Sequence, residues 1–198
     1  MGHLTSRRVL IVEDDTLVGM GLAKQLEKVG HEVVGQAANA EEATVLFNAR
    51  NPNLVLMDIR LRDDTDGIEL ARQLLAIRRV PMIILSAFVE PELIARASQA
   101  GVFGYVKKLS EDATLFAAME VAVKRFEDQE KLLQEKEQAV QSLEDRKILE
   151  RAKGVLMKRA NLTEADAHKR LQTESQKRRT NMIELAKKII ESDQVIGE

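Results

Sequence analysis

The 198-residue chain contains no cysteine and no tryptophan. The absence of cysteine excludes structural disulfides, thiolate metal sites and cysteine nucleophiles. The histidines, His3, His31 and His168, are too far apart in the sequence to indicate a metal-binding cluster. This composition fits a protein of a reducing compartment, and we expect a cytoplasmic location.

Long apolar runs are also missing. No stretch of about 18 uncharged apolar residues is present, so we expect no membrane span. The N-terminus lacks the charged, apolar and small-residue regions of a secretion signal. A glycine-rich phosphate loop ending in Lys-Ser or Lys-Thr is absent too, which argues against a kinase. We therefore predict a protein that is not a turnover enzyme.

Aromatic residues are few and lie only in the first two thirds of the chain: Phe47, Phe88, Phe103, Tyr105, Phe116 and Phe126. The charge is divided as well. Residues 1–120 carry 13 Lys and Arg against 17 Asp and Glu, whereas residues 144–190 carry 13 against 7. An acidic front and a basic back predict two modules with different partners.

An apolar run that ends in one carboxylate stands near the middle of the acidic module. Residues 54–57 are all apolar, and Asp58 follows them. Such a run predicts a strand buried on both faces, as in a parallel sheet. Ligands bind at the carboxyl edge of open parallel sheets, so Asp58 is a functional candidate there. An Asp that caps the next helix is an equally good interpretation of this stretch alone.

Four further apolar runs alternate with helical patterns. The expected strands cover residues 9–12, 31–37, 54–58, 81–85 and 103–107, and the expected helices cover residues 16–29, 39–50, 67–77 and 91–100. Asn39, with Glu42 three residues later, is typical of a helix N-terminus. The alternation predicts an α/β fold with a five-stranded, doubly wound parallel sheet.

Polar groups follow the ends of these strands: Glu13, Asp14, Asp58, Ser86 and Lys108. Clustered carboxylates repel one another unless a hard cation lies among them, and Mg²⁺ prefers carboxylate, carbonyl and water oxygens. A carboxylate facing such a cation can act as a nucleophile toward phosphorus. A hydroxyl and an ammonium on neighbouring strands would then hold the phosphoryl oxygens.

With this set of residues, the stretch from residue 9 to about 120 resembles the receiver domain of two-component response regulators, which has a flavodoxin-like fold. The resemblance implies that Asp58 accepts a phosphoryl group from a sensor histidine kinase. It implies that Glu13, Asp14, Asp58 and the backbone carbonyl of Arg60 bind Mg²⁺. The same resemblance identifies Ser86 as the switch hydroxyl, Tyr105 as the switch aromatic residue and Lys108 as the phosphate-binding lysine.

The sequence departs from the receiver pattern at two places. The family's lysine is normally followed by a cis proline, but Leu109 follows Lys108 here. A cis bond before a residue other than proline costs about 3 kcal/mol more than before proline, so we expect a trans bond. Lys107 could replace Lys108 as the phosphate ligand, but strand alternation counted from Tyr105 favours Lys108. The loop 60–66 is acidic and has no proline, which leaves its conformation open.

A long helical pattern follows, from Ser110 as the expected N-cap to about residue 161. Apolar residues recur every seven positions at Met119, Phe126, Leu133 and Val140, although the partner positions are only partly apolar. Residues 121–145 therefore form a helical linker, either a weak coiled coil that makes a homodimer or a single solvated helix.

Residues 146–191 hold three short helical patterns, which predict a small all-α bundle, and residues 1–8 and 192–198 are expected to be tails. We expect His168 to be a half-buried core residue of this bundle. The bundle is rich in Lys and Arg, as expected for a polyanion-binding surface, although a solvated helix face is the alternative. Because no aromatic residue follows Phe126, stacking of bases on rings is not available there.

The run Glu150-Arg151-Ala152-Lys153-Gly154-Val155-Leu156-Met157, together with residues 162–167 and Ala186, resembles the ANTAR domain. This family is the RNA-binding module of transcription antitermination regulators, and the similarity covers about residues 143–191. It implies binding to hairpins in a leader transcript. We expect the RNA-binding residues to include Arg151, Lys153, Gly154, Lys158, Arg178 and Arg179.

The sequence thus favours a phosphorylation-controlled antiterminator. One alternative is a DNA-binding response regulator with a helix-turn-helix, but its reading helix, residues 182–190, is poor in the side chains that read base edges. Another alternative is an antiterminator controlled by a partner protein instead of phosphorylation, which the missing proline after Lys108 keeps open.

Overall fold

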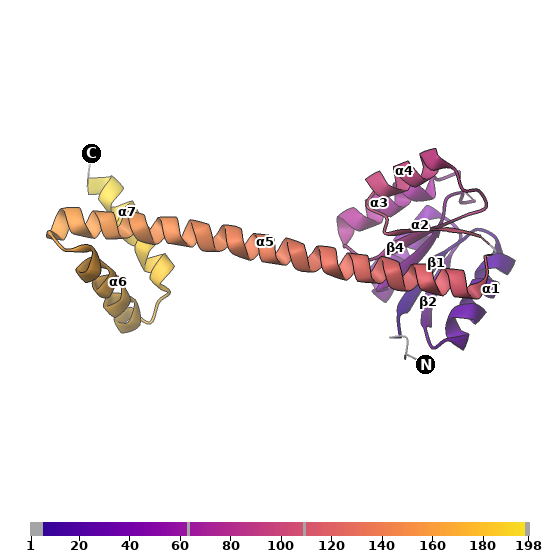
Figure 1. Cartoon of the computed structure of the whole chain (residues 1–198), viewed down its shortest axis with the longest axis horizontal. Coiled ribbons are helices and arrows are strands. Elements are labelled where there is room, and N and C mark those ends of the chain that lie inside the picture. Colours follow the sequence, from indigo (N-terminus) through magenta and orange to yellow (C-terminus); the bar gives the residue numbers. More distant parts are fainter. Residues whose placement is uncertain (1–5, 63, 109, 197–198) are drawn as a thin grey trace. The chain divides into compact units, whose positions relative to one another are not determined.

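The computed structural model describes residues 6–62, 64–108 and 110–196 (Figure 1). Leu109 lies outside the described residues, so the trans bond expected before it stays a prediction. Contacts divide the chain into two compact units, residues 1–130 and 131–198. Helix α5 (Asp112–Ala160) contributes residues to both units.

The strands of the first unit form one parallel sheet with the order β2-β1-β3-β4-β5. Their bounds are β1 (Arg8–Val12), β2 (Glu32–Ala37), β3 (Leu54–Asp58), β4 (Met82–Ser86) and β5 (Gly104–Lys107). Because β1 pairs with β2 on one side and β3 on the other, the winding direction reverses there. In such sheets this reversal creates a crevice at the carboxyl ends of the strands. The predicted doubly wound fold is confirmed.

Helices cover both faces of this sheet (Figure 1). One face packs against α2 (Ala40–Arg50), α3 (Gly67–Ile77) and α4 (Pro91–Gln99), and the other packs against α1 (Thr16–Lys28) and the first part of α5. Alternation along the strands divides the core between the faces: Leu10 and Val12 point to the first layer, and Val9 and Ile11 to the second. The three central strands, β1, β3 and β4, are buried on both faces over almost their whole length, as their unbroken apolar runs predict.

Side chains fix where the helices begin. The Asp15 carboxylate accepts hydrogen bonds from the backbone amides of Leu17 and Val18, and therefore caps α1. Asn39 accepts a hydrogen bond from the Glu42 amide, as predicted, and starts α2. The cap expected for α5 is wrong, because the amides of Thr114 and Leu115 donate to the carbonyl of Glu111 instead.

The expected heptad seam of α5 is partly used inside the first unit. Met119 and Ala122 are buried against the sheet, and the Phe126 ring makes an edge contact with Phe103 at a centroid distance of 5.3 Å. Farther along the helix, Val140 and Leu143 are exposed. Only this later part of the seam offers apolar surface to a partner.

The second unit consists of the C-terminal part of α5, α6 (Glu164–Arg178) and α7 (Met182–Ile196). Its buried core residues are Ala152, Leu171, Leu185 and Ala186. The hydroxyl of Thr163 accepts from the Asp166 amide and caps α6. Helix α7 continues past residue 192, where the sequence predicts a tail, because no Gly or Pro interrupts it before Gly197.

The expectation for His168 is wrong, since its side chain is exposed. Helix α6 instead buries Ala167, Leu171 and Ser175, which follow one another at intervals of four residues. This stripe faces the core of the unit, and His168 lies one position away from it.

His31, in contrast, is buried just before β2. Its side chain is 5% exposed, Nδ1 accepts a hydrogen bond of 3.2 Å from the Arg7 amide, and its ring lies 6.4 Å from that of Phe116. Burial lowers the pKa of His31, and the charge of Arg7 lowers it further, against an opposing effect of Glu120. The folded protein therefore holds this histidine neutral.

We predict that the free energy of unfolding decreases as the pH falls through about 6.5, the ordinary pKa of histidine, because the unfolded chain takes up a proton that the buried ring resists. Urea denaturation at several pH values measures this. His31→Asn should show a weaker pH dependence, and the exposed-site control His168→Asn should keep that of the wild type. Equal pH dependence in wild type and His31→Asn would contradict the assignment.

Candidate functional site

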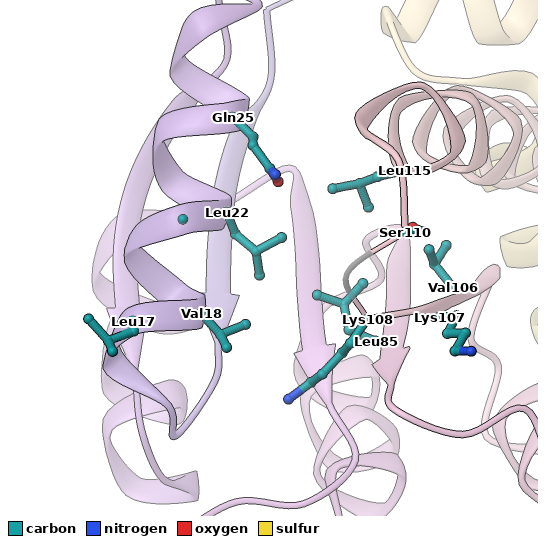
Figure 2. A pocket seen from close by; sticks show the side chains of 11 residues that line it. Leu17, Val18, Leu22, Gln25, Leu85, Val106, Lys107, Lys108, Ser110 and Leu115 are labelled. Atoms are coloured by element: carbon teal, nitrogen blue, oxygen red, sulfur yellow. The ribbon is translucent and has the colours of Figure 1, made fainter.

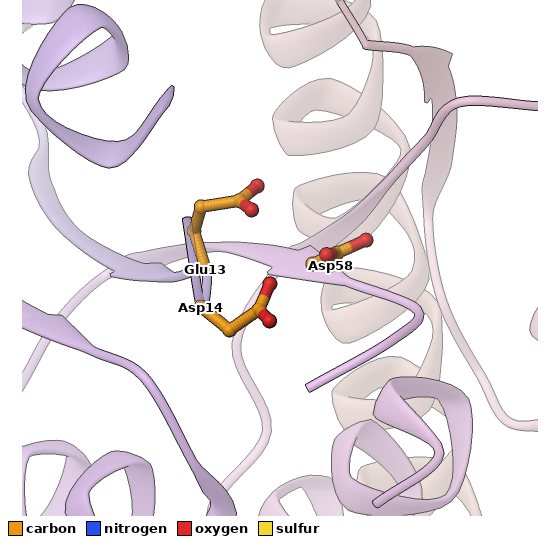
Figure 3. Close-up of side chains that lie close together, drawn as sticks. All are labelled: Glu13, Asp14 and Asp58. Atoms are coloured by element: carbon orange, nitrogen blue, oxygen red, sulfur yellow. The ribbon is translucent and has the colours of Figure 1, made fainter. Parts of the chain in front are cut away.

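Three carboxylates meet at the carboxyl ends of β1 and β3. Glu13, Asp14 and Asp58 each offer an oxygen within 4.8 Å of the others (Figure 3). Glu13 and Asp58 are each only 5% exposed. The neighbouring Asp15 caps α1 and is not part of this group. The structure thus brings together the acids that the sequence places at these two strand ends.

Lys108 joins the cluster from the end of β5. Its Nζ lies 2.7 Å from Asp58 Oδ2, and 2.8 Å and 2.7 Å from Glu13 Oε1 and Oε2. Lys107 is exposed, so strand alternation selects Lys108, as predicted. One ammonium group therefore bridges the ends of β1, β3 and β5.

Burial and charge act in opposite directions in this group. Burial raises the pKa of Glu13, and the neighbouring Asp58 charge adds to this, while the hydrogen bond from Lys108 lowers it. Burial alone would lower the pKa of Lys108, but hydrogen bonds to Asp58 and Glu13 outweigh it and the pKa is raised. The lysine stays charged, and one positive group faces three carboxylates.

The residues fit a hard divalent cation. Glu13 Oε2 is buried and, among the described residues, no donor is aligned with it for a hydrogen bond, although Lys108 Nζ is close. This buried carboxylate oxygen, together with the carboxylates of Asp14 and Asp58, matches the ligand preference of Mg²⁺. Arg60 lines the adjacent cavity, and the role of its carbonyl as a ligand stays a prediction.

A cavity of about 610 Å³ opens beside Asp58, and its lining includes Ser86, Phe88 and Lys108. The peptide groups of Phe88 connect two predicted site residues. Its N–H donates to Ser86 Oγ at 3.2 Å, and its carbonyl accepts from the Tyr105 hydroxyl at 2.8 Å. Ser86 and Tyr105 thus both bind Phe88 in the β4–α4 loop, one through its N–H and the other through its carbonyl.

Two arginine contacts at the site have no signal in the sequence pattern. The guanidinium of Arg62 donates to the Asp14 carbonyl at 3.1 Å and joins the β3–α3 loop to the loop between β1 and α1. Arg96 of α4 forms an ion pair with Asp66, whose carboxylate also caps α3. Both arginines fix loops around Asp58, and their partners are far apart in the sequence.

A second hollow of about 300 Å³ lies on the other side of Lys108, between α1, the ends of β4 and β5, and the start of α5 (Figure 2). Its lining is mainly apolar and includes Leu22, Leu85 and Leu115, with Leu17 81% exposed nearby. Gly21 lies on the same wall, and a Cβ added there would meet nothing within 4 Å. This face of α1 is open.

In the second unit, the predicted RNA-binding residues divide into two groups. Arg151, Gly154, Lys158, Arg178 and Arg179 are exposed. Lys153 is 8% exposed, and its Nζ lies 2.6 Å from Glu164 and 2.9 Å from Glu150. Hydrogen bonds to Glu164 and Glu150 raise its pKa. This geometry favours a role of Lys153 in joining α5 to α6 over the direct RNA contact predicted from the sequence.

Comparisons with known proteins agree with this architecture. Residues 9–120 match the response regulator receiver domain, and residues 137–190 match the ANTAR domain. The chain is 39% identical over 186 residues to the transcriptional regulatory protein PdtaR of Mycobacterium tuberculosis, which covers 94% of this chain and 90% of that protein. It is 35% identical over 103 residues to the response regulator protein VraR of Staphylococcus aureus, which covers 51% of this chain and 49% of that protein.

Among solved structures, the chain is similar to the signal receiver domain of a modulated diguanylate cyclase from Desulfovibrio desulfuricans. The TM-score is 0.58 with 34% identity, covering 63% of this chain and 98% of that domain. The chain therefore belongs to the response regulators that carry a receiver domain followed by an ANTAR domain. It is a signalling regulator. Within the part of the chain that the structure describes, no helix has the length and apolar character needed to cross a membrane.

We predict that Gly67→Ala damages the site, because the added Cβ would lie 1.8 Å from the Asp58 carbonyl oxygen. The end of β3 would have to move, with an expected loss of stability of about 1–3 kcal/mol. Thermal unfolding and the rate of phosphoryl uptake from acetyl phosphate are the measurements.

Gly21→Ala is the matched control for this substitution. It lies in a helix with open space around its Cα and should stabilise the protein by about 0.5–1 kcal/mol. If Gly67→Ala unfolds at the same temperature as the wild type and takes up phosphate as fast, the close approach to Asp58 is unimportant.

Proposed function

We propose that this protein is a phosphorylation-controlled regulator that binds hairpins in leader RNA and acts as a transcription antiterminator. The observation that carries the proposal is that one chain joins a Lys108-bridged acid cluster to an ANTAR unit with an exposed basic surface. A sensor histidine kinase is the expected phosphodonor, and the leader RNA is the expected target.

The acceptor is Asp58, with Glu13, Asp14 and the Arg60 carbonyl as the further Mg²⁺ ligands. When bound, Mg²⁺ supplies positive charge that offsets the carboxylates and the incoming phosphoryl oxygens. The Asp58 carboxylate forms a bond to phosphorus as the bond between phosphorus and the kinase histidine nitrogen breaks. Lys108 and Ser86, which line the same cavity, then donate to the phosphoryl oxygens.

The Phe88 contacts support a route from this reaction to the surface. If Ser86 Oγ turns toward the phosphoryl group, it no longer accepts from the Phe88 amide. The hydroxyl of Tyr105 holds the carbonyl of the same residue, so the loop and the tyrosine change position together. Added charge at Asp58 thereby selects a second arrangement of the β4–α4 loop.

We predict that the wild type takes up one phosphoryl group from acetyl phosphate in a Mg²⁺-dependent reaction and that Asp58→Asn does not. Intact-mass spectrometry measures the uptake. Asp64→Asn is the matched control, since Asp64 lines the same cavity and has a left-handed backbone, φ 57°, that Asn adopts readily. Equal uptake by Asp58→Asn and wild type would refute the assignment.

The RNA surface consists of Arg151, Gly154, Lys158, Arg178 and Arg179. Cations on phosphate supply most of the affinity, and each contact contributes about 0.7–0.9 to the salt slope. Arg178 also pairs with Glu174 at 3.2 Å, which holds its side chain on α6. Arg179 has a left-handed backbone, φ 50°, at the end of α6 and so lies at the turn into α7.

Gly154 supports close contact with an external chain. A Cβ at this helical position would meet nothing within 4 Å, so no packing inside the protein requires a glycine. Glycine in a helix interior costs about 0.5–1 kcal/mol relative to alanine. A backbone that approaches α5 at this point would explain the residue.

We predict that Gly154→Ala raises the free energy of unfolding by about 0.5–1 kcal/mol and yet weakens binding to a stem-loop RNA. Chemical denaturation and a binding titration measure the two effects. Duplex DNA of similar length and charge is the control ligand. Equal or tighter binding to DNA, or unchanged RNA affinity of Gly154→Ala, would speak for a solvated surface or a DNA contact.

The exposed apolar residues of α5 support homodimer formation as part of this function. Leu132 is 65% exposed, Leu143 is 60% exposed and Val140 is 48% exposed. All three residues lie in the part of α5 that follows residue 130, the end of the first unit. A second copy of α5 would bury them.

A further inference from the structure

A groove in the second unit, separate from the exposed basic residues of α5, lies between α6 and α7. Its volume is about 350 Å³. Its apolar lining residues are Leu156 of α5, Leu171 of α6, and Leu185 and Ile189 of α7, and of these Leu156 and Ile189 are partly exposed. Leu171 and Leu185 are also core residues, 1% and 5% exposed, so the groove reaches down to the core of the unit.

The rim of this groove is charged. Arg170, Arg178 and Lys188 are exposed cations around it, and Glu174 is the acid that lines it. Arg178 already contacts Glu174 at 3.2 Å. Three cations against one carboxylate favour a ligand with negative charge at its edges and an apolar, flat centre.

We propose that this groove receives one unpaired base of the RNA hairpin loop, an inference that rests on the proposed RNA binding. A nucleotide has the two properties that the groove selects, because its base is flat and largely apolar and its flanking phosphates are anionic. Bases within an A-form stem stay stacked, and side chains cannot enter the deep groove of the stem, whereas loop bases can turn outward.

The groove also supplies what the missing aromatic residues would supply in other RNA-binding modules. Leucine and isoleucine side chains offer an apolar surface below the base, and the guanidinium planes of Arg170 and Arg178 can stack at its edge. The Lys188 ammonium on the rim would bind a flanking phosphate. The structure thus combines base stacking and phosphate binding without a ring.

Glu174 gives the groove a chemical preference. A carboxylate accepts hydrogen bonds from the exocyclic amines of adenine, guanine and cytosine, whereas uracil offers it only a ring N–H that lies between two carbonyl acceptors. Because a carboxylate repels those acceptors, Glu174 favours an amine-bearing base over uracil. The groove therefore contributes specificity, while the residues around Gly154 contribute affinity for phosphate.

Abasic scanning of the hairpin loop tests the proposal with the full-length protein. One loop position should lose about tenfold in affinity when its base is removed, as expected for the loss of one stacked base. Ser192→Leu should remove this effect, because Ser192 lines the groove and a larger side chain there fills it. Ser192→Ala is the control and should keep the effect.

A matched pair of charge variants gives a second measurement. Lys188→Ala should weaken binding more than Lys187→Ala, although both remove one charge from neighbouring positions on α7, because only Lys188 lines the groove. Glu174→Gln should reduce the preference for an amine-bearing base over uracil at the sensitive loop position.

Three results would overturn the base-binding groove. One is an abasic profile that is the same in Ser192→Leu and wild type. Another is equal affinity of the Lys188→Ala and Lys187→Ala variants. The third is that Ser192→Leu changes the association state measured by sedimentation but leaves RNA binding unaltered, which would assign the groove to a second copy of the chain. If the wild type binds no stem-loop RNA at all, the proposed function fails and this inference fails with it.

Discussion

The contact of Lys108 with Asp58 and Glu13 is the interaction on which the receiver site depends. Parallel strands deliver acids to one sheet edge, and at separations of a few ångströms in a partly buried setting their repulsion is strong. One ammonium, 2.7 Å from Asp58 Oδ2, offsets only part of it. Lys108 therefore holds the cluster together, but the three carboxylates still carry more negative charge than one ammonium group offsets. A divalent cation offsets the remaining negative charge, and it also offsets the charge that a transferred phosphoryl group adds.

The second constraint is the close packing of the backbone at Gly67 against the end of β3, which holds the β3–α3 loop in place. The Gly67 amide donates to the Ile59 carbonyl at 2.7 Å, and the start of α3 rests directly on the end of β3. Arg62 and the Arg96–Asp66 pair hold the same region from β1 and α4. The backbone around Asp58 is thus held by close packing and a backbone hydrogen bond. The loop around Phe88, on the other side of the site, is joined to the sheet by hydrogen bonds to the side chains of Ser86 and Tyr105.

Local patterns predict the sheet and the helix cap at Asn39. They also predict that Glu13, Asp58 and Lys108 meet, because the ends of parallel strands share one edge of the sheet. Arg62 and Arg96 could not be predicted, since flexible side chains reached partners far away in sequence. The resemblance of residues 150–157 to the ANTAR family predicts an RNA contact for Lys153, whereas the structure encloses its side chain. Lys153 follows Ala152 and lies between Leu149 and Leu156 on the apolar side of α5, so helical periodicity contained a signal that it is enclosed.

The chain has one tyrosine and no tryptophan. That tyrosine, Tyr105, donates a hydrogen bond from its hydroxyl to the carbonyl of Phe88, a residue that lines the cavity at Asp58. The tyrosine emission of the unlabelled protein, which is distinct from the weaker emission of phenylalanine at shorter wavelength, therefore comes from one position in β5. Loss of a hydrogen bond to a carbonyl changes the environment of a phenol, so the molecule contains its own optical probe of the loop, without an introduced dye.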